Sequence, residues 1–88
     1  LGAMQRGDLD LAIEQLRRYV QAVPDDALAW ATLGQVLLVT GELDAAADAM
    51  SHARAKRSLL DDQAKQALDG ELEAYRAERR TITGQDAP

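Results

Sequence analysis

The chain has 88 residues, of which 47% are hydrophobic and only 3% aromatic, and its formal net charge is −5 at pH 7. That length suits one domain with one modest core, and the shortage of aromatic residues favours packed helices over a β-sandwich. The acidic balance argues against nucleic acid or an anionic membrane as the partner, and the absence of cysteine excludes disulfides and thiolate metal sites.

The first predicted helix falls within residues 7–26. Apolar side chains recur there at the three- and four-residue spacing of a helix with one buried face. They are Leu9, Ala12, Ile13, Leu16, Tyr19, Val20 and Val23. Pro24 is expected to end this helix, and Asp25 and Asp26 are expected to cap the one that follows.

The second predicted helix, residues 27–40, carries no charged residue. A helix that is apolar all round needs cover on nearly all sides, and we expect Trp30 within it to be largely buried. Gly41 suits the left-handed position that ends a helix, and apolar residues at helical spacing resume after it. The short connection predicts that residues 27–58 form an antiparallel hairpin.

An internal repeat relates this hairpin to the first helix. Four pairs of identical residues occur at one offset of 34 residues: Gly7/Gly41, Leu9/Leu43, Asp10/Asp44 and Ala12/Ala46. A period of this length is the sequence signature of stacked helical units. Each copy reads as a turn followed by a helix.

Residues 59–80 predict a long helix that leaves the repeat pattern. One face is apolar and the outer face is charged, as a terminal capping helix needs for solubility. Ser58 with Asp61 resembles a capping box at its start. Residues 81–88 are expected to form a flexible tail.

The central hairpin resembles the tetratricopeptide repeat in its motif W-x2-L-G-x2-Y, turn glycine, A-x3-F-x2-A. The residues at the motif positions are Trp30, Leu33, Gly34, Leu37, Gly41, Leu43, Ala46, Met50 and Ala53. The resemblance implies an all-α fold of antiparallel helical hairpins, an α-solenoid fragment. It divides a single domain, residues 1–80, into the second half of a truncated repeat (7–26), a complete repeat (27–58) and a capping helix (59–80).

In this family the first helix of each repeat lines a concave groove that grips a peptide or helix of a partner protein. The resemblance therefore implies a binding surface formed by Asp26, Leu28, Ala31, Gln35, Leu38, Val39, Lys65 and Asp69. Its apolar character favours a hydrophobic or amphipathic partner segment over a carboxylate. The same residues could instead pack against the capping helix, and that alternative stays open. The function indicated is a protein-binding scaffold module, of bacterial style in its Ala- and Arg-rich composition.

Self-association is the second hypothesis. The truncated repeat lacks its first helix, which would leave an apolar stripe on residues 7–26 without a mate. The residues concerned are Ile13, Leu16, Tyr19 and Val20. A two-fold dimer would cover them. A third hypothesis makes the chain a regulatory appendage of a larger enzyme.

No constellation of residues indicates catalysis, a metal or a cofactor. His52 is the only histidine and is expected at the surface, and paired aspartates such as Asp61 and Asp62 are typical of helix starts. The basic clusters at residues 54–57 and 76–80 are interpreted as solvated helix faces. No apolar run reaches the roughly 20 residues of a membrane span, so we expect no membrane insertion, and the compartment stays open between cytoplasm and periplasm.

Overall fold

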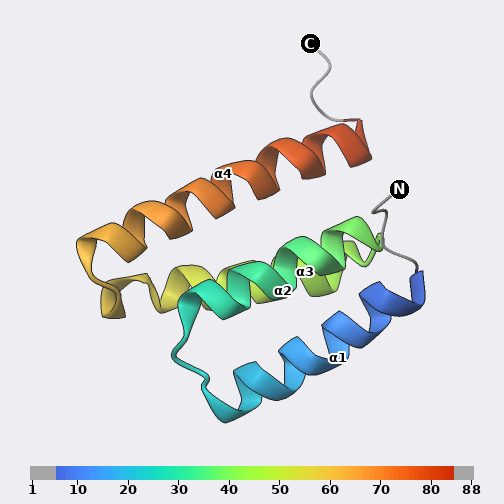
Figure 1. Ribbon diagram of the computed structural model, residues 1–88. Coiled ribbons are helices and arrows are strands. Elements are labelled where there is room, and N and C mark those ends of the chain that lie inside the picture. The colour runs from blue at the N-terminus through green and yellow to red at the C-terminus, as the bar shows by residue number, and fades with distance from the viewer. Residues whose placement is uncertain (1–5, 85–88) are drawn as a thin grey trace.

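The computed structural model of the protein describes residues 6–84. Within that range every regular element is helical, which confirms the predicted all-α class. The elements are α1 (Arg6–Ala22), α2 (Ala27–Val39), α3 (Leu43–Ala55), a short 3-10 helix η1 (Arg57–Leu59) and α4 (Asp62–Thr83) (Figure 1). No helix in this range is both long and apolar enough to cross a membrane.

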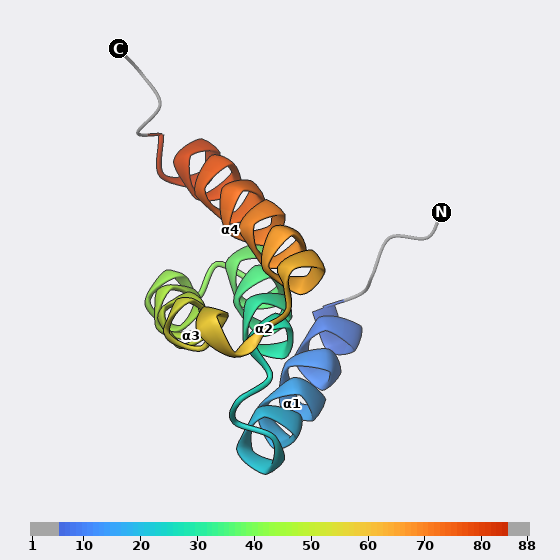
Figure 2. The same ribbon diagram turned by 90° about the vertical axis from the view of Figure 1, so that its left-hand side faces the viewer.

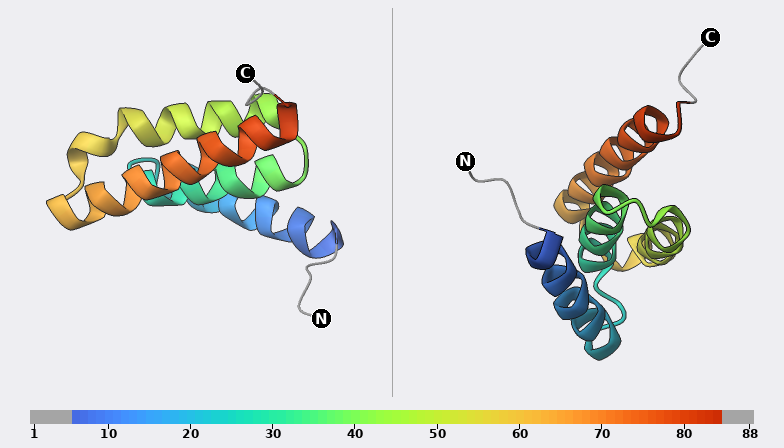
Figure 3. Two further views of the ribbon diagram at one scale, coloured as in Figure 1. Left: turned by 90° about the horizontal axis from the view of Figure 1, so that it is seen from above. Right: turned by 90° about the vertical axis from the view of Figure 1, so that its right-hand side faces the viewer.

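Helix α2 occupies the centre of the molecule, as its charge-free sequence predicts. It packs against α1 on one side, α4 on another and antiparallel α3 on a third. Figures 2 and 3 show α1, α2 and α4 side by side in an arc, with α3 on the outer, convex side of α2. The inner side of the arc is open along α2.

The helix ends follow local capping chemistry. The Asp26 carboxylate accepts a hydrogen bond from the Ala29 amide at 3.1 Å, which confirms the predicted cap of α2. Gly41 has φ +86°, the left-handed conformation expected after α2. The cap of α4 is Asp61, whose carboxylate accepts from the Ala64 amide at 2.8 Å, whereas the predicted capping residue Ser58 lies in η1.

Helix α4 also extends beyond its predicted end at residue 80. It continues to Thr83 and is closed by Gly84 at φ +70°, so residues 81–84 belong to the helix and its cap and not to a tail. The remainder of the predicted tail, residues 85–88, lies outside the described residues.

The core forms where α2 crosses its neighbours. Its largest fully buried side chains are Leu37, Leu38, Met50 and Leu68. Gly34 lets α3 approach closely, since a Cβ placed on it would lie 3.0 Å from both Cε and Cγ of Met50. This is the close crossing that the repeat motif predicts.

Trp30 is only half-buried, which corrects the expectation that it lies largely inside the hairpin. Its ring stacks on the imidazole of His52, with centroids 4.1 Å apart and planes inclined by 19°. The indole Nε1 donates to the Pro24 carbonyl at 2.9 Å. His52, expected to be a partly exposed surface residue, has a side chain that is 43% exposed and covers one face of the tryptophan.

Candidate protein-binding surfaces

An uncharged strip of α2 is left partly exposed by the other helices. Leu28, Thr32, Gln35 and Val39 follow one another at spacings of four, three and four residues, which places them on one side of the helix. Thr32 and Val39 are exposed, and Leu28 and Gln35 are half-buried. Val39 alone leaves 63% of its surface in solvent. We refer to these four residues as the α2 stripe.

Two residues predicted to line the groove, Ala31 and Leu38, have no exposed surface at all. They lie one turn before and one turn after Gln35, whose Nε2 donates to the carbonyl of Glu71 at 2.9 Å and to its Oε1 at 3.2 Å. This side of α2 is therefore covered by α4. The full burial of Ala31 and Leu38 excludes them from an exposed groove and favours the open alternative, in which they pack within the chain.

The two predicted flanking residues on α4 lie away from the stripe. Asp69 accepts two hydrogen bonds from Arg57 of η1, at 2.9 Å from Nε and 2.8 Å from Nη2. Those hydrogen bonds hold the pKa of the Asp69 carboxyl below its usual value. Lys65 precedes Asp69 by one turn and shares its side of the helix, whereas Glu71 is turned about 200° from Asp69 and borders the stripe.

Asp26, predicted at the rim of the groove, serves the structure of the hairpin. Besides capping α2, its Oδ2 accepts a hydrogen bond from the Tyr19 hydroxyl at 2.7 Å. This hydrogen bond, together with the negative charge of Asp26, raises the pKa of Tyr19. The residue joins the end of α1 to the start of α2.

The apolar stripe predicted to be unmated on α1 is partly covered within the chain. Ile13 and Val20 are 5% and 2% exposed, so the expectation that they need a second chain is wrong. Both belong to the core cluster that α1 forms with α2. Leu16 is half-buried and Tyr19 is 44% exposed. With Val23, 42% exposed, they leave a shorter strip at spacings of three and four residues.

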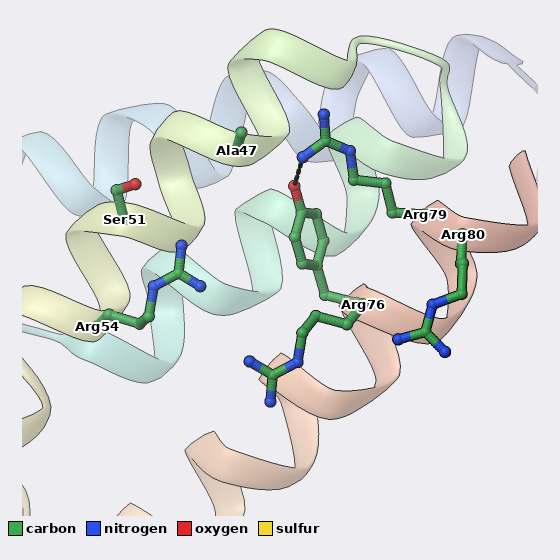
Figure 4. Close-up of a pocket in the computed structure, with 7 residues that line it drawn as sticks. Ala47, Ser51, Arg54, Arg76, Arg79 and Arg80 are labelled. Atoms are coloured by element: carbon green, nitrogen blue, oxygen red, sulfur yellow. Dashed lines mark hydrogen bonds between the residues drawn. The ribbon is translucent and has the colours of Figure 1, made fainter. Parts of the chain in front are cut away.

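A cleft of about 410 Å³ separates α3 from α4 on the other side of the molecule (Figure 4). Four arginines line it, one from α3 and three from α4, and no acidic side chain does. The lining residues are Ala47, Ser51, Arg54, Tyr75, Arg76, Arg79 and Arg80. We call this the arginine cleft.

The sequence predicts that these arginines belong to two separate solvated clusters, at residues 54–57 and 76–80. The spacing of Arg76 and Arg80, one helical turn apart, shows from sequence that they share a side of α4. Nothing in the sequence shows that Arg54 of α3 faces them, because that depends on how α4 crosses the hairpin. The cleft therefore emerges only from the fold.

Metal chemistry finds no support in the described part of the chain, where no three potential ligands among His, Asp and Glu come together. His52, the one histidine, is stacked on Trp30 and has a carboxylate neighbour in Asp48, with Nε2 and Oδ2 3.6 Å apart.

Side-by-side helices that each contact their sequence neighbours, with an open inner face, define a fragment of an α-solenoid. A family model described as the tetratricopeptide repeat matches residues 1–59, and the chain belongs to that family. The match spans α1, α2, α3 and η1 and ends before α4. Members of the family generally mediate protein–protein interaction and are typically not enzymes. No match was found among curated proteins or among solved structures.

Proposed function

We propose that the chain binds a segment of a partner protein along the α2 stripe. The observation that carries this proposal is the exposure of Val39, which leaves 63% of an apolar residue in water on the same side of α2 as Leu28, on a helix without charged residues. In a chain of which 28% is charged, an exposed strip without any charge is suited to an apolar contact.

The partner that fits is an amphipathic helix or extended segment with an apolar face. Leu28 and Val39 offer apolar contacts at the two ends of the stripe. Between them Gln35 uses Nε2 to bind Glu71, and its Oε1 accepts no hydrogen bond within residues 6–84. That oxygen is available to a donor on the partner. Thr32 Oγ1 already donates to the Leu28 carbonyl at 3.0 Å.

Site-specific crosslinking in the cell of origin tests this proposal. A photoreactive amino acid at Val39 of the full-length protein should capture a partner that the same group at Leu59 does not. Leu59 is the matched control, because it is apolar and 62% exposed but lies on η1. With the purified partner, Val39→Glu should weaken binding and Leu59→Glu should not. Equal capture at both positions, or unchanged binding by Val39→Glu, contradicts the proposal.

Self-association through α1 is a second candidate, supported by the strip of Leu16, Tyr19 and Val23. Sedimentation equilibrium over a concentration series measures it directly. If α1 mediates a two-fold dimer, the mass rises toward twice that of the chain and Val23→Glu abolishes the rise, while Leu59→Glu has no effect. A monomer throughout the micromolar range removes this candidate.

A further inference from the structure

The arginine cleft concentrates positive charge in a chain whose net charge is −5. Outside the cleft, Arg18 is paired with Glu14 and Arg57 with Asp69. In the cleft Arg76 has such a partner, the exposed Glu73 at 3.0 Å. Arg54 and Arg80 have no ion pair among residues 6–84. The cleft therefore carries a local excess of positive charge.

The fold brings this excess together across two helices. Figure 4 shows Arg54 reaching from α3 and Arg76 from α4 on opposite sides of the cleft. Like charges that face each other repel, and α3 and α4 make few contacts with each other directly. Arg54 and Arg80 lie in the last turns of α3 and α4, where they also complement the helix dipoles, but that effect needs no second helix opposite. An anion between the helices would neutralise the repulsion.

The walls leave room for more than a point charge. Ala47 and Ser51 are small residues one turn apart on α3, facing α4 across a space of about 410 Å³. The Tyr75 hydroxyl accepts from Arg79 Nη1 at 3.3 Å, so its own proton can be donated to a ligand. The cleft thus offers hydroxyl donors beside the guanidinium groups.

The spacing of the arginines suits alternate residues of an extended peptide. Arg76 and Arg80 are separated by about 6 Å along the axis of α4, at 1.5 Å per residue. Side chains two residues apart on an extended strand point the same way and are separated by about 6.6 Å. Carboxylates in a Glu-x-Glu segment can therefore meet successive guanidinium groups, which bind carboxylates through two parallel hydrogen bonds.

We infer that the arginine cleft binds an acidic, extended segment of a protein partner. Its small size, within a chain that is acidic overall, favours a few carboxylates over a nucleic acid, whose phosphates need a broad basic face. The cleft lies on the side of α4 away from Glu71 and the α2 stripe. The inference draws on the interaction function of the family but is independent of the stripe.

The test uses a fluorescein-labelled peptide, Glu-Gly-Glu-Gly-Glu, titrated with the purified full-length protein and followed by fluorescence anisotropy. Saturable binding is expected at low ionic strength, with clear weakening at 1 M salt as the screening length falls to about 3 Å. The analogue Gln-Gly-Gln-Gly-Gln should not bind. Arg54→Gln and Arg76→Gln should each weaken binding of the acidic peptide about tenfold or more, as expected for loss of a charge-assisted hydrogen bond.

Arg18→Gln is the matched control, because it removes the same charge from an exposed arginine on α1. It should leave the affinity unchanged, and circular dichroism should show that all three variants melt like the parent. Val39→Glu should also leave peptide binding intact, so that failure of the stripe and failure of the cleft are told apart. Three results overturn the inference: no binding of the acidic peptide, equal weakening by Arg18→Gln, or tighter binding of a single-stranded oligonucleotide at matched salt.

Discussion

Two helical glycines of the chain have opposite surroundings. A Cβ at Gly34 would meet Met50 at 3.0 Å, whereas one at Gly70 would meet nothing within 4 Å. Gly34→Leu gains somewhat under 1 kcal/mol of helix propensity but overpacks the crossing of α2 and α3, which typically costs about 1–3 kcal/mol. We expect a net loss of stability, measured as the free energy of unfolding in urea.

Gly70→Ala is the control at the open position. It should stabilise the chain by about 0.5–1 kcal/mol, because it gains propensity and meets no neighbour. A Gly34→Leu variant as stable as Gly70→Ala would show that Met50 moves aside without cost, and the close crossing would lose its importance.

Trp30 depends on its neighbours for cover. Truncation to Ala removes its apolar contacts, its stack on His52 and the hydrogen bond to Pro24. Because the side chain is half-buried, we expect a loss of about 3 kcal/mol, the low end for a tryptophan. His52→Ala should cost about 1 kcal/mol through the stack alone. In a double-mutant cycle by chemical denaturation, losses that simply add would contradict a direct contact between the rings.

The motif residues of the sequence predicted the hairpin, but not how closely each would be covered. Gly34 and Met50 meet as the repeat pattern requires, because both lie at the crossing itself. Trp30 lies at the edge of that crossing, and its exposure depends on a histidine 22 positions later on another helix. Helical periodicity gives the side of a helix on which a residue lies and not the neighbour that covers it.

At the scale of elements, the ion pair of Arg57 and Asp69 fastens α4 to η1. Arg57 lowers the pKa of Asp69 in the folded chain, so this carboxylate stabilises the fold at every pH above its unfolded pKa, about 3.9. The contribution is lost as the pH falls through the lower folded pKa. Asp69→Asn should therefore lose less stability than the parent between about pH 5 and pH 2, measured by chemical denaturation.

Arg57→Gln breaks the same pair from its other end. It should flatten the acid dependence as Asp69→Asn does, and the double variant should add nothing. If Arg57→Gln leaves the acid dependence of the parent in place, another partner is responsible for the lowered pKa of Asp69.

Element boundaries were predictable where the signal is local. Asp26 and Gly41 act through groups a few residues away, so their roles could be read from the sequence. The start of α4 at Asp62 and its continuation to Thr83 could not be predicted. Both Ser58 and Asp61 can cap a helix, and Asp61 caps α4 because Ser58 is part of η1. The arginine cleft could not be predicted from the sequence either, since it depends on the crossing of α3 and α4.

At the scale of the whole molecule, α4 buries apolar surface that the repeat alone would leave in water. Leu68 and Leu72 are 0% and 5% exposed, and burying each contributes roughly 1.5–3 kcal/mol. A domain of this length has only about 4–13 kcal/mol in total. A fragment of residues 1–60 also exposes Ala31 and Leu38 of α2, and we expect it to be largely unfolded by circular dichroism.

Adding a peptide of residues 57–84 should restore helical signal to that fragment, and the same peptide carrying Leu68→Asp should not. A fragment that folds alone would show that the hairpin and α1 suffice.

The sequence predicted a capping helix at residues 59–80, and its apolar face at Leu68, Leu72 and Tyr75 is buried. The sequence did not show how much of α2 would be buried, and two of the predicted groove residues, Ala31 and Leu38, are fully buried.

Helix α4 lies between two surfaces of different chemistry, the α2 stripe and the arginine cleft. Glu71 borders the uncharged stripe of α2, and Arg76, turned by about 140°, borders the arginine cleft. A change in the position of α4 therefore alters both the α2 stripe and the arginine cleft. If a ligand on each side changes the position of α4, binding at the two sites is coupled, and reciprocity then requires that each ligand change the affinity of the other by the same factor.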